Sequence, residues 1–320
     1  MNSKRSTITL TYGDQAENHK GMEMLGTMVD EGQGFQVEEL KQIHAKLIEK
    51  GFKAELHALN TKPEHPAAAL LVVKDFADRV LKPLGKNKED LFLEQARLEV
   101  DKQAFMYGRV VNKNARWNLC FDDTAQEPDY QNGKGRIYSF SSVPLTTAVT
   151  DTFIDYFGPK AAALKGEGNY YYDVNECGIG FHGDSERRKV VAIRLGASLP
   201  IHYQWFYRGS PVGERMIFKL DGGDVYVMSE KTVGTDWKKK VVYTLRHATG
   251  CSKFTTIAVK KEGGEKKGKA SAKAVSKGKV IERRIFQADS SDSSSEEEAP
   301  TEKRGAVSID ELTKKGSQKD

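Results

Sequence analysis

Closely spaced, strand-like segments in the last part of the chain constrain its fold more than any other feature of the sequence. Each is rich in β-branched and aromatic residues and is bounded by Gly, Pro or Asp, which favour turns. Many short strands of this kind predict a β-sandwich or barrel. The predicted strands cover residues 190–195, 201–206, 215–220, 224–228, 240–245 and 254–259.

Helical patterns precede this β region. Apolar side chains recur on one side of a predicted helix over residues 147–157. Near the N-terminus, strands at 6–12 and 52–59 flank a predicted helix over residues 37–50, which stops at Gly51. We therefore expect a mainly β protein with flanking helices (α+β) and a small N-terminal α/β extension over residues 1–65.

The formal net charge of +5 is unevenly distributed along the 320 residues. The chain up to about residue 259 is nearly neutral, whereas the last sixty residues are basic at first and then acidic and rich in serine. Such a composition buries too little apolar surface to fold, so we expect a disordered tail over residues 261–320. Its basic half suits nucleic-acid phosphates and its serines suit phosphorylation, but a plain solubility tail explains the composition equally well.

Several protein classes do not fit this sequence. No apolar run approaches the roughly 20 residues of a membrane-spanning helix, and the N-terminus lacks the apolar core of a secretory signal. The three cysteines are odd in number and widely spaced, which predicts neither a disulfide framework nor a structural zinc site. We expect an intracellular protein, nuclear or cytoplasmic, that does not contact membranes.

A candidate metal site begins with His182 and Asp184. Residues two apart on an extended segment project to the same face, so both side chains can bind one cation. A 2-His-1-carboxylate site needs a second histidine. His247 follows after several further strands, as a ligand from another part of a β-structure should, whereas His202 lies on the very next strand. An ordinary surface or core histidine beside Arg246 is the alternative interpretation of His247.

These residues belong to an ordered set of motifs between about residues 70 and 259, and the set resembles the AlkB-type branch of the Fe(II)- and 2-oxoglutarate-dependent dioxygenases. The order is far more specific than any single motif. The motifs are, in sequence, Gly108-Arg109-Val110, the predicted helix around Phe153, Tyr172, His182 with Asp184, Glu186, Leu195-Gly196, the strand at 201–206, the segment 223–228 and His247.

The resemblance implies a double-stranded β-helix, or jelly-roll, within a dioxygenase domain over residues 66–260, with a lid at about 105–140 and a core at about 165–260. It implies Fe(II) at His182, Asp184 and His247, with 2-oxoglutarate and dioxygen as cosubstrates. The implied activity is oxidative demethylation of an N-alkylated nucleobase in DNA or RNA. A protein or small-metabolite hydroxylase, and an inactive binding module, are the alternatives.

The resemblance also suggests how 2-oxoglutarate would be held. The family places an arginine at the start of its last strand to bind the far carboxylate; here that position is taken by Lys253, with Tyr172 as the hydroxyl donor. Lysine cannot form the bidentate contact of arginine, so Arg246 and Lys260 are further candidates. An alternative register puts Tyr243–Arg246 on the final strand, but it leaves Trp237 where the histidine belongs.

Substrate contacts are predicted around the lid. In the family, an acid four residues after the first metal ligand contacts the exocyclic amine of the base, and Glu186 stands at that position. Arg109, Arg116 and Asn118 lie in a stretch where cations alternate with aromatic residues. Such a stretch can neutralise phosphates and stack on an extruded base.

Overall fold

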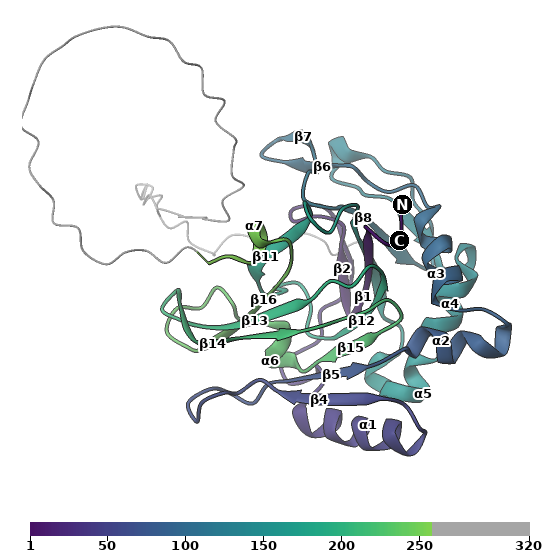
Figure 1. Cartoon of the computed structure of the whole chain (residues 1–320). Helices are drawn as coiled ribbons and strands as arrows, with labels where there is room; N and C mark the ends of the chain where they lie inside the picture. The colour runs from purple at the N-terminus through teal and green to yellow at the C-terminus, as the bar shows by residue number, and fades with distance from the viewer. Residues whose placement is uncertain (258–320) are drawn as a thin grey trace, which may run out of the picture. The chain divides into compact units, whose positions relative to one another are not determined.

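The computed structural model describes residues 1–257 of the chain. These residues form two facing β-sheets and a group of helices (Figure 1). The large sheet has eight strands and the small sheet has four. In spatial order the large sheet contains β4 (Ala54–Ala58), β5 (Ala69–Val73), β15 (Val225–Met228), β12 (Val190–Gly196), β1 (Thr7–Gly13), β10 (Lys165–Tyr171), β8 (Trp117–Asp122) and β9 (Ile137–Ser139). The small sheet contains β11 (Gly178–His182), β16 (Thr244–Gly250), β13 (Ile201–Tyr207) and β14 (Ser210–Phe218).

The remaining elements are two hairpins and seven α-helices, besides short 3₁₀ turns, within the described residues. The hairpins pair β2 (Gln15–Glu17) with β3 (Met24–Gly26), and β6 (Gln103–Met106) with β7 (Arg109–Asn112). The helices are α1 (Val37–Glu49), α2 (Phe76–Leu81), α3 (Lys88–Ala96), α4 (Pro144–Thr150), α5 (Phe153–Phe157), α6 (Glu230–Val233) and α7 (Ser252–Thr255). Among residues 1–257, no helix is long and apolar enough to cross a membrane.

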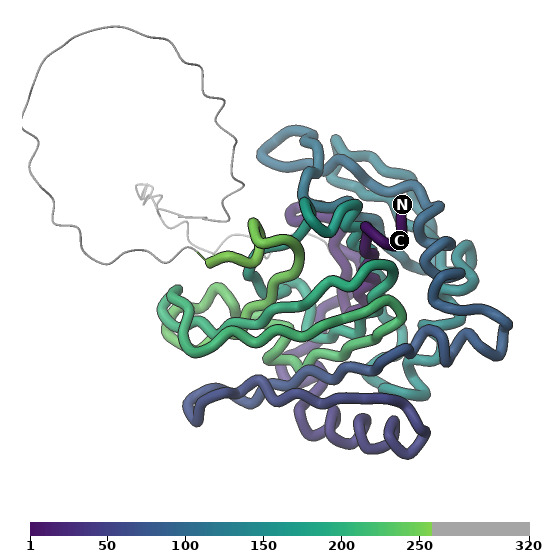
Figure 2. Tube along the Cα trace, viewed as in Figure 1, coloured from purple at the N-terminus to yellow at the C-terminus, as the bar shows by residue number. Residues whose placement is uncertain are grey.

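The large sheet has a different apolar core on each face. Alternate residues of its strands, such as Leu10 and Ile193, pack against the helices in one core. The residues between them, such as Ala192 and Tyr226, pack against the small sheet in a second core. Figure 2 shows the small sheet and the helices α2 to α5 on opposite sides of the large sheet. The structure is therefore layered as helices, large sheet and small sheet, which confirms the mainly β class.

The N-terminal strand β1 is an inner strand of the large sheet, paired along its length with β10 on one side and β12 on the other. The strands predicted at 6–12 and 52–59 and the helix predicted at 37–50 are confirmed as β1, β4 and α1. They do not form a separate N-terminal extension, however, because β1, β4 and β5 belong to the same sheet as β10, β12 and β15.

Some predicted elements differ from the structure. The helix expected over 147–157 is two short helices, α4 and α5, interrupted after Thr150. The strand expected at 240–245 begins only at Thr244, because the preceding residues, such as Val241, are exposed and unpaired in a turn. The strand expected at 254–259 is wrong over its described part, where Ser252–Thr255 forms α7. The predicted tail over residues 261–320 lies outside the described residues.

Gly250 explains why no strand continues from β16. Its φ of 116° is a conformation that residues with a Cβ rarely adopt, and a Cβ there would meet the backbone of Gly178 and Cys177. The chain therefore turns at Gly250, and α7 packs beside β11 and β16.

Candidate metal centre

Three potential metal ligands meet at one edge of the small sheet. His182 ends β11, Asp184 follows two residues later, and His247 lies opposite His182 on the neighbouring strand β16. The Nε2 atoms of His182 and His247 are 3.5 and 3.3 Å from Oδ1 of Asp184, and one ligand atom from each residue lies within 4.8 Å of the others. The predicted convergence of these side chains is thus observed, and the group could bind a metal ion.

Hydrogen bonding directs the His182 lone pair toward the other two side chains. Nδ1 of His182 lies 2.7 Å from the carbonyl oxygen of Gly180 and donates to it, which leaves Nε2 as the acceptor. Burial, with help from the charge of His247, lowers the pKa of His182 to about 3. The ring is therefore neutral near pH 7, which is the form that binds metals.

Asp184 is ionised although it is largely buried. Burial raises the pKa of its carboxyl, but His247 and Arg187 lower it by more, so the net pKa lies well below the ordinary range. Its backbone N–H donates to the carbonyl oxygen of Val233. Gly183 allows this close approach, because a Cβ there would lie 2.1 Å from the carbonyl oxygen of Gly234. The glycine between the two ligands is required by packing against the loop after α6.

We call His182, Asp184 and His247 the metal group. Arg187 connects this group to two further carboxylates. Its side chain is 3% exposed, and it pairs with Glu167, Glu186 and Asp184. Burial raises the pKa of Glu186, and the neighbouring Arg187 opposes that shift. Glu186, a predicted substrate contact, therefore lies in the same cluster as Asp184.

Two other predicted substrate residues reach this cluster through Asn169. Nε of Arg116 and Nδ2 of Asn118 donate to Oδ1 of Asn169 at 2.6 and 2.9 Å, and Nδ2 of Asn169 donates to Glu167 at 2.9 Å. The charge of Arg116 also contributes to the lowered pKa of His182, behind burial and His247. Arg109 is not part of the cluster, because it is exposed on β7.

A comparison with known proteins identifies a relative in a giant virus. An uncharacterized protein of Acanthamoeba polyphaga mimivirus is 47% identical over 261 residues, which cover 79% of this chain and 99% of the viral protein. The chain belongs to the family of this viral protein. No protein-family model matches the chain.

In this member of the family, the side chains predicted to bind a cosubstrate lie apart from the three potential metal ligands. Lys253 is exposed on α7 and not on a strand. Tyr172 donates through its hydroxyl to the carbonyl oxygen of Asn114 and stacks on Trp117. These two residues line a shallow depression of their own, to which none of the three potential metal ligands contributes. The prediction that Lys253 lies on a final strand is wrong, because the chain turns into α7 at Gly250.

Arg246 lies on the opposite face of β16 from His247. It packs over the ring of Phe206 at 4.1 Å and near Trp237 at 5.2 Å. Since alternate residues of a strand point to opposite faces, Arg246 is directed away from the metal group. The alternative register is only partly right: Tyr243–Arg246 does run into the last described strand, but the residue that converges on His182 and Asp184 is His247 and not Trp237. Lys260 lies outside the described residues.

Arg194 was not predicted as a site residue. This residue lies on β12, directly opposite Thr9 of β1, and its side chain is 1% exposed. The alternation of residues along β12 could have indicated it. Arg194 shares a strand face with Val190 and Ala192, which point toward the small sheet. Val191 and Ile193 point to the opposite face, toward the helices. A charged residue at such an alternating position marks a buried polar site.

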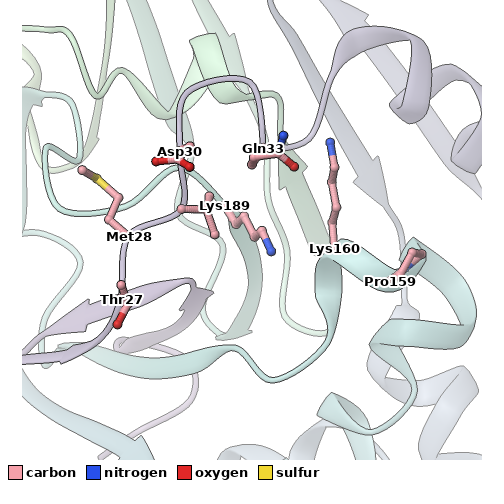
Figure 3. Close-up of a pocket in the computed structure, with 8 residues that line it drawn as sticks. Thr27, Met28, Asp30, Gln33, Pro159, Lys160 and Lys189 are labelled. Atoms are coloured by element: carbon pink, nitrogen blue, oxygen red, sulfur yellow. The ribbon is translucent and has the colours of Figure 1, made fainter.

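A wide surface depression elsewhere is formed by other residues. Figure 3 shows Thr27, Met28, Asp30 and Gln33 on one side of it, Pro159 and Lys160 on the other, and Lys189 between them. The ammonium group of Lys160 is already bonded, at 2.7 Å, to both the carbonyl oxygen of Gly34 and the carboxylate of Glu39. Asp30 is the one carboxylate among the residues that line the depression, and no histidine or cysteine accompanies it there.

Proposed function

We propose that this chain is an Fe(II)- and 2-oxoglutarate-dependent dioxygenase that removes an N-alkyl group from a nucleobase in DNA or RNA. The convergence of His182, Asp184 and His247 at the edge of a β-sandwich supports the proposal most strongly. A 2-His-1-carboxylate set binds one face of the metal and leaves positions open for a chelating acid and dioxygen.

The donor set fits Fe(II). Nε2 of each imidazole faces the Asp184 carboxylate, and His182 is held in one tautomer by Gly180. When bound, the iron would couple oxidation of 2-oxoglutarate to succinate and carbon dioxide with hydroxylation of a substrate C–H bond. Arg187 and the backbone of Val233 hold Asp184 in place for this role.

The order of the strands is compatible with a double-stranded β-helix. Strands β10 to β13 alternate between the large and the small sheet, and β15 and β16 do so again. In our interpretation β1, inserted between β10 and β12, completes the large sheet next to the metal group. The N-terminal strand would then belong to the catalytic domain.

The surroundings of the metal group support a nucleobase as the substrate. Arg116 is held against Asn169 at the cluster, and the ammonium group of Lys102 lies 4.6 Å from the centre of the Trp117 ring. At the tip of the β6–β7 hairpin, Tyr107 is 88% exposed. Cations beside aromatic rings can bind a phosphate backbone and stack on a base. Glu186, half-buried at the cluster, would contact the exocyclic group of that base.

The proposal is tested with purified protein, Fe(II), 2-oxoglutarate and methylated DNA and RNA oligonucleotides. We expect formaldehyde and succinate to form in equal amounts. The variants His182→Ala and Asp184→Ala should abolish both products, whereas His202→Ala, a buried histidine outside the metal group, should retain them. Succinate formed only with peptides or small metabolites would indicate a hydroxylase of those substrates, and a protein that binds no iron would be a binding module.

A further inference from the structure

A polar row crosses the large sheet on the face that points toward the small sheet. Asn118 of β8, Asn169 of β10, Thr9 of β1 and Arg194 of β12 lie opposite one another in register on four adjacent strands. The neighbours of Thr9 along its strand, Ile8 and Leu10, face the helices. The row therefore lies between the two sheets, and Asn169 joins it to the cluster around Arg187 and Asp184.

Arg194 is the only charged member of this row, and no described residue neutralises its charge. Its Nη1 donates to the Thr9 hydroxyl, but its Nε has no partner, and no carboxylate of residues 1–257 forms an ion pair with it. Arg187, by contrast, is surrounded by three carboxylates. A buried, unpaired charge is strongly unfavourable, so Arg194 is a candidate site for an anion that residues 1–257 do not supply.

The hydroxyl group of Tyr203 is a second unpaired polar group between the two sheets of the described chain. Tyr203 is fully buried, and its hydroxyl has no hydrogen-bond partner among residues 1–257. Its ring lies 6.0 Å from that of His247, its direct neighbour on β16. Tyr203 packs in the core between the two sheets together with Ala192, which lies two residues before Arg194 on the same face of β12. Tyr203 thus faces the same space between the sheets as Arg194 and adjoins His247.

We propose that Arg194, with the hydroxyl of Tyr203, binds the far carboxylate of a dicarboxylic 2-oxo acid whose other end chelates the metal. This inference rests on the proposed function and adds the residue that selects a diacid over a monoacid. Guanidinium and phenol donate the two hydrogen bonds that a carboxylate accepts. The anchor comes from an inner strand, beside the N-terminal strand β1, and not from a residue after β16.

The experiment compares the affinity of the Mn(II)-loaded protein, without oxygen, for 2-oxoglutarate and for 2-oxobutanoate, which lacks the far carboxylate. Isothermal titration calorimetry measures both. We expect wild type to prefer 2-oxoglutarate. Arg194→Met should weaken 2-oxoglutarate binding about 100-fold, because it removes one partner of a buried charged pair, and should leave 2-oxobutanoate binding unchanged. Arg246→Met is the matched control and should change neither.

A second variant covers the case in which Arg194→Met does not fold. Tyr203→Phe removes a hydroxyl that has no partner in the described part of the chain, so it should leave the thermal stability intact while weakening 2-oxoglutarate binding about 10-fold. Wild-type affinity for 2-oxoglutarate in Arg194→Met, or equal loss of both acids, would overturn the inference and leave the dioxygenase proposal standing. A metal-loaded wild type that binds neither acid would refute the proposed function itself.

Discussion

Arg187 controls the charge balance beside the metal group. Its guanidinium is buried among Glu167, Glu186 and Asp184, which would otherwise repel one another in a poorly solvated space. At the scale of single residues, the arrangement therefore depends on one arginine that pairs with three carboxylates and on another, Arg194, that pairs with none among residues 1–257.

We predict that Arg187→Met lowers the free energy of unfolding by about 3 to 5 kcal/mol near pH 7, because it leaves buried carboxylates without a counter-charge. Burial already raises the pKa of Glu186, and without the opposing guanidinium its folded-state pKa rises further above its unfolded value. The variant should thus lose stability as the pH rises from 5 to 8 and be closest to wild type in acid. Urea unfolding at several pH values measures this, with the exposed Arg97→Met as control. A deficit that does not depend on pH would contradict the assigned charges.

At the scale of elements, β1 links the two cores of the protein. Its residues Ile8, Leu10 and Tyr12 pack against the helices, while Thr9 bonds Arg194 on the other face. The alternating pattern of the strand predicts its existence but not its neighbours. Its partners, β10 and β12, lie more than 150 residues away in the chain. Such pairing depends on the whole sheet, which is why residues 1–65 were predicted as a separate extension.

We predict that Leu10→Ala lowers the free energy of unfolding by about 3 kcal/mol, because Leu10 is 1% exposed in the core between sheet and helices. The exposed Leu93→Ala on α3 should cost less than about 1 kcal/mol. Chemical denaturation measures both. If β1 were a peripheral extension, Leu10→Ala would leave the main unfolding transition unchanged.

The local sequence pattern predicts the positions of most strands, but it does not predict where the last strand of the described chain ends. Turn residues and β-branched runs located β12, β13 and β15 to within a residue or two. The run after Cys251 has the same composition, yet it begins as α7, because Gly250 turns the chain there. Because of this difference we propose as the carboxylate anchor not Lys253, which is exposed, but Arg194, whose burial follows from the pairing of β12 with β1.

At the scale of the whole molecule, the two sheets bring ligands from distant parts of the chain to one place. His182 and Asp184 were predictable from their spacing, and His247 from its position several strands later. Their convergence depends on β16 pairing with β11, which places His247 opposite His182. The polar row beside them requires the register of four strands of the large sheet, and no local pattern specifies that register.

The most direct test of the account is an anaerobic titration of the protein with Fe(II), or with Mn(II) as a substitute, followed by thermal unfolding. We predict one ion bound per chain and a stabilisation of about 2.7 kcal/mol at a free metal concentration 100 times the Kd. His202→Ala should behave as wild type, whereas His182→Ala, Asp184→Ala and His247→Ala should each lose the stabilisation. Undiminished metal binding in His247→Ala would contradict the proposed metal centre.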